Sequence, residues 1–228
     1  MPLPVLLAVP HAGLRVPPEV AELCLLAPED LVADSDEDAA EIYAVQAEVS
    51  GFVAAEIARA FVDVNRPEDD RGRDGALKLI TRRSKATVYR SPPSPETMES
   101  LLERYHRPYH RRLSALAKDV RLGIDCHTMA ERRPGGNPET AGERPWICLS
   151  DAEQTCPRRQ FYEFQRCLEE AFECVVSLNL PFKGGHTIRS HAKELPWVQL
   201  ELSRAPYTSN AAKRDRLLAA LEALFSQG

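Results

Sequence analysis

The sequence predicts an α/β fold, a three-layer sandwich in which helices flank a central mixed, mostly parallel β-sheet. Short apolar segments of strand length alternate along the chain with longer segments of helical periodicity, which is the pattern of a sheet covered by helices. The 228 residues contain no internal repeat and no linker, so we expect a single domain over residues 1–228.

The first half of the chain supplies three expected strands and two expected helices. Residues 3–9 are almost entirely apolar and predict a buried strand. Prolines at the start of residues 17–26 favour a short helix, and acidic residues in the first turn favour another over residues 36–49. The apolar runs at residues 52–57 and 60–64 predict two further strands.

The second half begins with the longest helical pattern, residues 95–120, in which apolar side chains recur every three or four positions. Pro108 is expected to kink this helix because proline lacks the backbone N–H. Residues 121–126 and 146–149 predict strands. The polar segment between them, residues 130–144, is rich in Gly and Pro and predicts a long loop of the kind that can cover an active site.

Three elements complete the predicted sandwich. Residues 157–173 and 209–225 are expected to be helices because their apolar positions recur at helical spacing. Residues 197–202 predict a strand with two alternating faces. One face carries Trp197, Gln199 and Glu201, and the other carries Val198, Leu200 and Leu202.

Composition and charge exclude several classes of function. The net charge of −5 gives no reason to expect nucleic acid as a partner. No stretch approaches the roughly 18–20 apolar residues of a membrane helix, and the apolar N-terminus lacks the basic start of a signal peptide. Six cysteines without a CxxC pair indicate reduced, buried thiols, so we expect a cytoplasmic protein.

Polar side chains with no obvious structural purpose accompany four of the expected strands, at or near their ends. They are His11, the group Asp63, Asn65 and Arg66, the pair Asp125 and His127, and Glu201. A carboxylate in an apolar strand is costly to bury unless it is paired or bound to a metal. Because sites in such sheets lie at the strand ends, these side chains are candidates for one shared site.

The residue types match a catalytic zinc site. Two imidazoles and one carboxylate leave an open position on a tetrahedral zinc ion, and a separate glutamate can take a proton from water. His11 and His127 supply the imidazoles, residues 34–38 offer carboxylates, and Glu201 is the candidate base. Simpler interpretations stay open: the acidic run suits a helix N-terminus, and Glu201 suits a solvated strand face or an ion pair with Arg204.

Two other polar segments carry a weaker signal. His106 and His110 are spaced like a helical metal pair, but Pro108 lies between them and no Glu follows the first His, which favours polar residues at a helix edge. Residues 183–187 contain two glycines without the spacing of a phosphate-binding loop, which favours a hinge or a loop that contacts substrate.

Seven short motifs in order along the chain resemble the N-formylglutamate amidohydrolase family. They are Pro10-His11-Ala12-Gly13, Asp34-Ser35-Asp36 with Ile42-Tyr43, Phe61-Val62-Asp63-Val64-Asn65-Arg66-Pro67, Pro108-Tyr109-His110, Asp125-Cys126-His127-Thr128-Met129, Phe182-Lys183-Gly184-Gly185-His186-Thr187-Ile188-Arg189, and Val198-Gln199-Leu200-Glu201-Leu202. The chain departs from the family over residues 74–95, which look shorter, and after Met129.

The resemblance implies a zinc hydrolase with a fold similar to zinc carboxypeptidases and aspartoacylase-like enzymes. By the resemblance, His11 and His127 are zinc ligands, and the carboxylate ligand is Asp36 in preference to Glu37. Glu201 is then the general base and afterwards the general acid.

The resemblance also implies roles around the metal. Asn65 and Arg66 bind the carboxylate of the substrate, since an Arg guanidinium suits a bidentate contact. Arg189 and His186 are further candidates for substrate contact. Asp125, on the same strand face as His127, is expected to orient that imidazole.

The expected reaction is metal-dependent hydrolysis of the amide of an N-acyl amino acid, with N-formyl-L-glutamate giving L-glutamate and formate as the leading case. The partner is then a small molecule, and the family suggests histidine catabolism. Two alternatives stay open: a carboxypeptidase-like or other N-acyl-amino-acid hydrolase, and a binding relative without activity.

Overall fold

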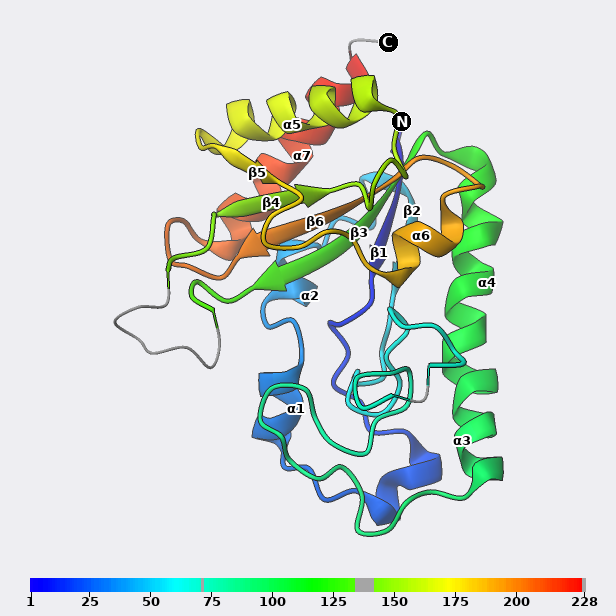
Figure 1. Ribbon diagram of the computed structural model, residues 1–228. Helices are drawn as coiled ribbons and strands as arrows, with labels where there is room; N and C mark the ends of the chain where they lie inside the picture. The colour runs from blue at the N-terminus through cyan, green and yellow to red at the C-terminus, as the bar shows by residue number, and fades with distance from the viewer. Residues whose placement is uncertain (71, 134–141, 227–228) are drawn as a thin grey trace.

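One mixed sheet forms the centre of the molecule (Figure 1). The computed structural model describes residues 1–70, 72–133 and 142–226. Within these residues the sheet has six strands in the order β2-β1-β3-β6-β4-β5. They are β1 (Leu3–Val9), β2 (Val49–Ala54), β3 (Leu122–Met129), β4 (Ile147–Ser150), β5 (Val176–Leu178) and β6 (Trp197–Ser203). All neighbours pair in parallel except β4 and β6, so the predicted mixed, mostly parallel sheet is confirmed.

Helices cover both faces of this sheet, which gives the three layers expected from the sequence. One face packs against α2 (Ala39–Ile42), α5 (Arg158–Phe172) and α7 (Asn210–Ser226), and Figure 1 shows α5 and α7 side by side. The other face packs against α4 (Arg107–Leu116) and α6 (His186–His191). Figure 1 also shows α1 (Pro28–Asp34) with the cyan segment below the sheet.

The apolar periodicity of the sequence explains how α5 seals one of these layers. Phe161, Phe164, Leu168 and Phe172 recur at spacings of three and four and are all buried. Each such side chain contributes about 1.5–3 kcal/mol when it leaves water. The helix ends at Glu173, whose left-handed backbone (φ 54°) cannot continue it.

The long helical pattern over residues 95–120 is present but divided. After α3 (Pro95–Leu101) comes a π-helical turn, η2 (Leu102–His106), in which the Arg107 N–H donates to the Leu102 carbonyl five residues back. Pro108, which has no backbone N–H to donate, is the second residue after this turn. The chain then continues as α4 and ends in a short 3₁₀ turn, η3 (Ala117–Asp119).

The alternating faces predicted for β6 are confirmed. Val198, Leu200 and Leu202 belong to one core cluster, and Trp197 belongs to the cluster on the opposite face. Gly123 on β3 makes room for the indole, because a Cβ there would lie 2.3 Å from the ring of Trp197. Glu201 therefore projects from the same face as Trp197.

Several sequence expectations were wrong in detail. Residues 60–64 form a turn segment and no strand, and the helix expected over residues 36–49 is limited to α2. The strand expected at 52–57 begins earlier, as β2, and the 3₁₀ helix η1 (Pro18–Leu23) replaces the helix expected at 17–26. Residues 134–141 of the expected loop lie outside the described residues.

Candidate metal centre

The candidate site lies at the carboxyl ends of three adjacent strands. His11 follows β1, His127 is near the end of β3, and Glu201 lies opposite His127 in the register of β6. Asp36 comes from the segment after α1, and its backbone N–H donates to the His11 carbonyl at 3.0 Å. The parallel sheet thus brings together four of the side chains that the sequence singles out.

Two imidazoles face one carboxylate oxygen. His127 Nδ1 lies 2.8 Å from Asp36 Oδ2, and His11 Nδ1 lies 3.4 Å from the same oxygen. All three side chains are buried, with 3–5% of each residue exposed. Among the described residues, this group and one other have the ligand spacing of a metal site.

The opposite nitrogen of each imidazole is held by a second carboxylate. His11 Nε2 donates to Asp63 Oδ1 at 2.8 Å, and His127 Nε2 donates to Asp125 Oδ2 at 3.0 Å. A carboxylate can only accept, so each Nε2 carries its proton and each Nδ1 turns a lone pair toward Asp36. Histidine ligands of metals are held in this way in many proteins. Asp125 thus contacts His127 as the sequence analysis expects.

The pKa values reflect how closely these charges lie. Burial on its own lowers the pKa of His127, but Asp125 and Asp36 outweigh it and raise that pKa well above the ordinary value. Burial raises the pKa of Asp36, but His11 and His127 outweigh it and hold that pKa well below the ordinary range. The arrangement therefore requires a cation between His127 and Asp36, either a proton or a metal ion.

The donor set fits a metal ion. Two imidazole nitrogens and one carboxylate oxygen converge, and each imidazole is oriented by a carboxylate behind it. Glu37, the alternative ligand, has a side chain that is 43% exposed and lies 3.9 Å from Arg204. The geometry thus favours Asp36 as the carboxylate of this centre.

A buried cationic pair supports Asp63. Arg59 Nη2 and Lys78 Nζ donate to Asp63 Oδ2 at 2.9 and 2.7 Å, and Arg59 Nη1 donates to His11 Nδ1 at 3.1 Å. Burial alone raises the pKa of Asp63, but these two cations outweigh it and hold the pKa well below the ordinary range. Arg59 and Lys78 were not among the residues predicted from the sequence. The signal was present, because each is a charged residue inside an apolar run.

Asn65 lies between the metal centre and the glycine-containing loop. Its Nδ2 donates to Asp125 Oδ2 at 3.0 Å, and its Oδ1 accepts from the backbone N–H of Thr187 at 2.8 Å. A Cβ at Gly185 would lie 2.7 Å from the Asn65 amide, so only glycine allows this contact. Both ends of the amide are engaged, which favours a positioning role over the expected contact with a substrate carboxylate.

Glu201 is the buried carboxylate beside this centre. It is 5% exposed and accepts a hydrogen bond from Gln199 Nε2 at 2.9 Å. Burial, together with the charges of Asp36 and Asp125, raises the pKa of Glu201 to about 7. A carboxylate with this pKa can both take and give a proton near neutral pH.

These side chains border a cleft of about 480 Å³ with a strongly basic lining. Its basic residues are Arg59, Arg66, Arg82, Arg83, Lys85, Arg133, Arg144 and Lys183. Arg144 lies over the ring of Phe182, with 5.1 Å between its guanidinium carbon and the ring centre. The loop glycines Gly184 and Gly185 also line the cleft.

Two expected substrate contacts lie apart from the cleft lining. Arg189 donates to the Ala152 carbonyl at 3.4 Å, and the ring of His186 packs against those of His106 and His110. Arg66 does reach the cleft. Its guanidinium donates to the carbonyl and the carboxylate of Asp74 at 2.8 and 3.0 Å, and to the Asn65 carbonyl at 3.0 Å.

Comparison with known proteins identifies the family. The sequence model described as N-formylglutamate amidohydrolase matches residues 3–208. The chain belongs to the N-formylglutamate amidohydrolase family. It is 30% identical over 222 residues to an N-formylglutamate deformylase of Pseudomonas putida, covering 90% of this chain and 82% of that protein. The resemblance drawn from the seven motifs is therefore confirmed.

Solved structures of this fold agree with the sheet described above. A crystal structure of N-formylglutamate amidohydrolase from Ralstonia eutropha JMP134 superposes with a TM-score of 0.77 at 22% identity, covering 99% of this chain and 94% of that one. A gene product of Agrobacterium tumefaciens gives a TM-score of 0.73 at 18% identity, covering 98% and 88%. At these identities the likeness establishes the fold.

Family membership supports an amidohydrolase activity for the chain. The site agrees with this class, because it combines a fitting metal centre with a buried carboxylate of raised pKa. Within the described part of the chain, no helix has both the length and the apolar character that crossing a bilayer requires.

Proposed function

We propose that this chain is a zinc-dependent amidohydrolase that cleaves N-formyl-L-glutamate into L-glutamate and formate. The observation that carries the proposal is the pair of imidazoles whose Nδ1 atoms face Asp36 Oδ2 while Asp63 and Asp125 hold their Nε2 atoms. The name of the Pseudomonas putida relative, N-formylglutamate deformylase, supports the choice of substrate. Zinc suits a set of two nitrogen ligands, one oxygen ligand and one open position.

The metal would be held by His11, Asp36 and His127, and when bound it supplies Lewis acidity at the edge of the cleft. Glu201 takes a proton from a water molecule as the water oxygen bonds to the formyl carbon. It returns this proton to the amide nitrogen as the C–N bond breaks, which releases glutamate as the leaving amine.

The charge state of Glu201 is set by its surroundings. Burial raises its pKa to about 7, while His127 and Arg144 act in the opposite direction. A bound divalent cation acts in the same direction as His127 and Arg144, so it favours the ionised form that accepts the proton. The burial of Glu201 also keeps the carboxylate from bulk water while the proton is transferred.

The basic lining suits a substrate with two carboxylates. Three of the five N–H groups of Arg66 donate to Asp74 and to the Asn65 carbonyl, which fixes the guanidinium and leaves two N–H groups for a substrate carboxylate. Arg144, whose guanidinium carbon lies over the ring of Phe182 and whose charge lowers the pKa of Glu201, would bind a second carboxylate. We therefore assign substrate anchoring to Arg66 and Arg144, and the positioning of Asp125 to Asn65.

The proposal is tested by measuring formate release from N-formyl-L-glutamate before and after chelation, and again after zinc is restored. N-acetyl-L-glutamate and a glutamyl dipeptide, assayed in parallel, separate a deformylase from a broader acyl-amino-acid hydrolase or a carboxypeptidase. We expect chelator-sensitive activity that is highest on the formyl substrate. A pure protein that carries no stoichiometric metal and releases no formate would leave only a binding relative without activity.

A further inference from the structure

The six histidines of the chain divide between two clusters. His11 and His127 form the metal centre of the cleft, and the other four lie together where α4 meets α6. His110 is the centre of the second cluster: its ring lies 4.7 Å from that of His106, 5.3 Å from that of His186 and 5.2 Å from that of His191. The proposed hydrolysis uses none of these four side chains.

Two of the rings are fixed by backbone carbonyls. His106 Nε2 donates to the Arg66 carbonyl at 2.8 Å, and His110 Nε2 donates to the Val64 carbonyl at 2.9 Å. Since a carbonyl can only accept, each Nε2 carries the proton and each Nδ1 of the neutral ring keeps a lone pair. Histidine ligands of metals are prepared in the same way, with the outer nitrogen donating to a carbonyl or carboxylate.

The contact between His110 and His191 requires a cation. His191 Nδ1 lies 2.9 Å from Glu194 Oε2, so this nitrogen also carries a proton. In neutral rings the facing atoms, His110 Nδ1 and His191 Nε2, would then point two lone pairs at each other across 2.9 Å. One extra proton would relieve this contact, and so would a metal ion.

An extra proton between these two rings explains this one contact but does not explain why His106 and His186 also gather around His110. One ligand nitrogen from each of His106, His110 and His186 lies within 4.8 Å of the other two, which is the spacing of a metal site. His106 and His110 also border a surface depression of about 720 Å³, which gives the cluster access to solvent. Arg107, on the same depression, is neutralised by Glu68, Glu99 and Glu103.

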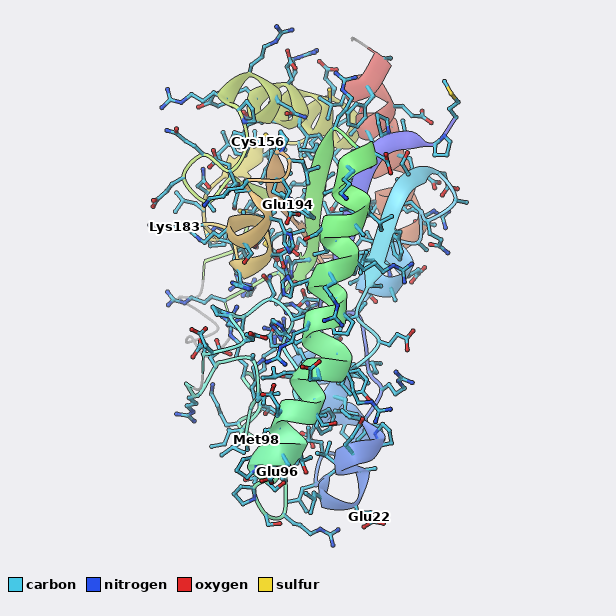
Figure 2. All side chains as sticks on the ribbon, turned by 90° about the vertical axis from the view of Figure 1, so that its right-hand side faces the viewer. Glu22, Glu96, Met98, Cys156, Lys183 and Glu194 are labelled. Carbon is cyan, nitrogen blue, oxygen red and sulfur yellow. The ribbon has the colours of Figure 1, made fainter. Side chains whose placement is uncertain are left out.

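We propose that His106, His110 and His186 form a second metal site for a divalent ion of the zinc type, with His191 as the neighbouring imidazole that can complete the set. Imidazole ligands favour zinc, copper, nickel or cobalt over magnesium or calcium. The ion would link the start of α4 to α6. Figure 2, which looks onto α4, shows Glu194 beside that helix, and Ser114 on α4 donates to Glu194 at 2.8 Å.

The site would act as a brace for the cleft. The carbonyls that hold His106 and His110 belong to the two neighbours of Asn65. Asn65 in turn contacts Asp125 and Thr187, and Thr187 is in α6 next to His186. Fixing α4 to α6 therefore fixes the segment that orients the cleft centre.

The test is to measure how many zinc ions each chain binds. The protein is purified without an affinity tag and stripped of metal with a chelator. It is then reloaded with zinc, and the excess metal is removed. Mass spectrometry of metals is expected to give two zinc ions per wild-type chain. His127→Gln, which disables the cleft centre, should keep one, His110→Gln should keep one, and the double variant should keep none. Ser114→Ala is the matched control, because it alters the Glu194 contact without removing a ligand nitrogen, and it should keep two.

His186→Gln is a second test in case His110→Gln does not fold, since His186 is half-buried at the first position of α6. The His186→Gln variant should also keep one zinc ion. In the double variant His127→Gln, His186→Gln, added zinc should no longer raise the melting temperature. Two zinc ions retained by both His110→Gln and His186→Gln would overturn the proposal. One zinc ion in the wild type, lost only with His127→Gln, would also overturn it and leave a shared proton between His110 and His191.

Discussion

The substitution Asp63→Asn tests how the buried charges support the metal centre. Asp63 is fully buried and accepts from Arg59, Lys78 and His11 at 2.7–2.9 Å. Asn has the same shape but no charge, so two buried cations lose their main counter-charge. Removing one partner of a buried ion pair costs about 3–5 kcal/mol. Two cations lose a partner here, but Arg59 keeps a weaker one in Asp36, 3.7 Å away. We therefore expect the free energy of unfolding to fall by an amount within this range.

In a chain of 228 residues this loss corresponds to a melting temperature lower by roughly 6–20 °C. The affinity for zinc should also fall about 10–100-fold, because His11 loses the carboxylate that orients it. Chemical denaturation of metal-free protein measures the first effect, and competition with a chromophoric chelator measures the second.

Asp74→Asn is the matched control for this experiment. Asp74 makes the same kinds of contact, with Arg66 and Arg82, but its side chain is 44% exposed. An exposed pair of this kind contributes about 0–1 kcal/mol. If Asp63→Asn destabilises no more than Asp74→Asn and binds zinc like the wild type, the buried network does not support the centre and the reasoning is refuted.

Three further predictions concern chemistry, substrate binding and the thiols. Glu201→Gln should lower kcat by about 10²–10⁴ while the zinc content stays unchanged, and unaltered turnover would exclude Glu201 as the base. Arg66→Ala should raise KM most for substrates with a free carboxylate, and an equal effect on the amidated analogue would rule out anchoring. Ellman's reagent should react quickly with no more than two of the six cysteines in native protein, Cys24 and Cys174, because the other four are buried. Fast reaction of a third would contradict the burial described.

Strands with one dominant apolar pattern were predictable from the sequence. Residues 3–9 coincide with β1, and residues 197–202 lie within β6, because a run that must be buried in a sheet leaves a clear signal. Residues 60–64 gave the same signal and are buried, yet they form a turn segment. Their apolar side chains belong to the core cluster that contains Trp197. Apolar character thus predicted burial but not hydrogen-bond pairing, which depends on neighbours distant in the sequence.

The site was predictable where single residues stood out against their surroundings. His11, His127 and Glu201 interrupt apolar segments, and the structure places them at neighbouring strand ends. The second histidine cluster was not predictable, because His106 and His110 meet His186 and His191 only through the packing of α4 against α6. Contacts between helices about 80 residues apart leave no periodic signal in one sequence.

The central claim is that His11, Asp36 and His127 hold a metal ion next to Glu201. A crystal of zinc-loaded protein, with diffraction recorded on both sides of the zinc absorption edge, tests this claim most directly. We expect an anomalous peak in contact with His11 Nδ1, Asp36 Oδ2 and His127 Nδ1, beside the Glu201 carboxylate. A map with no peak at these atoms, or a peak held by Glu37 in place of Asp36, would contradict it.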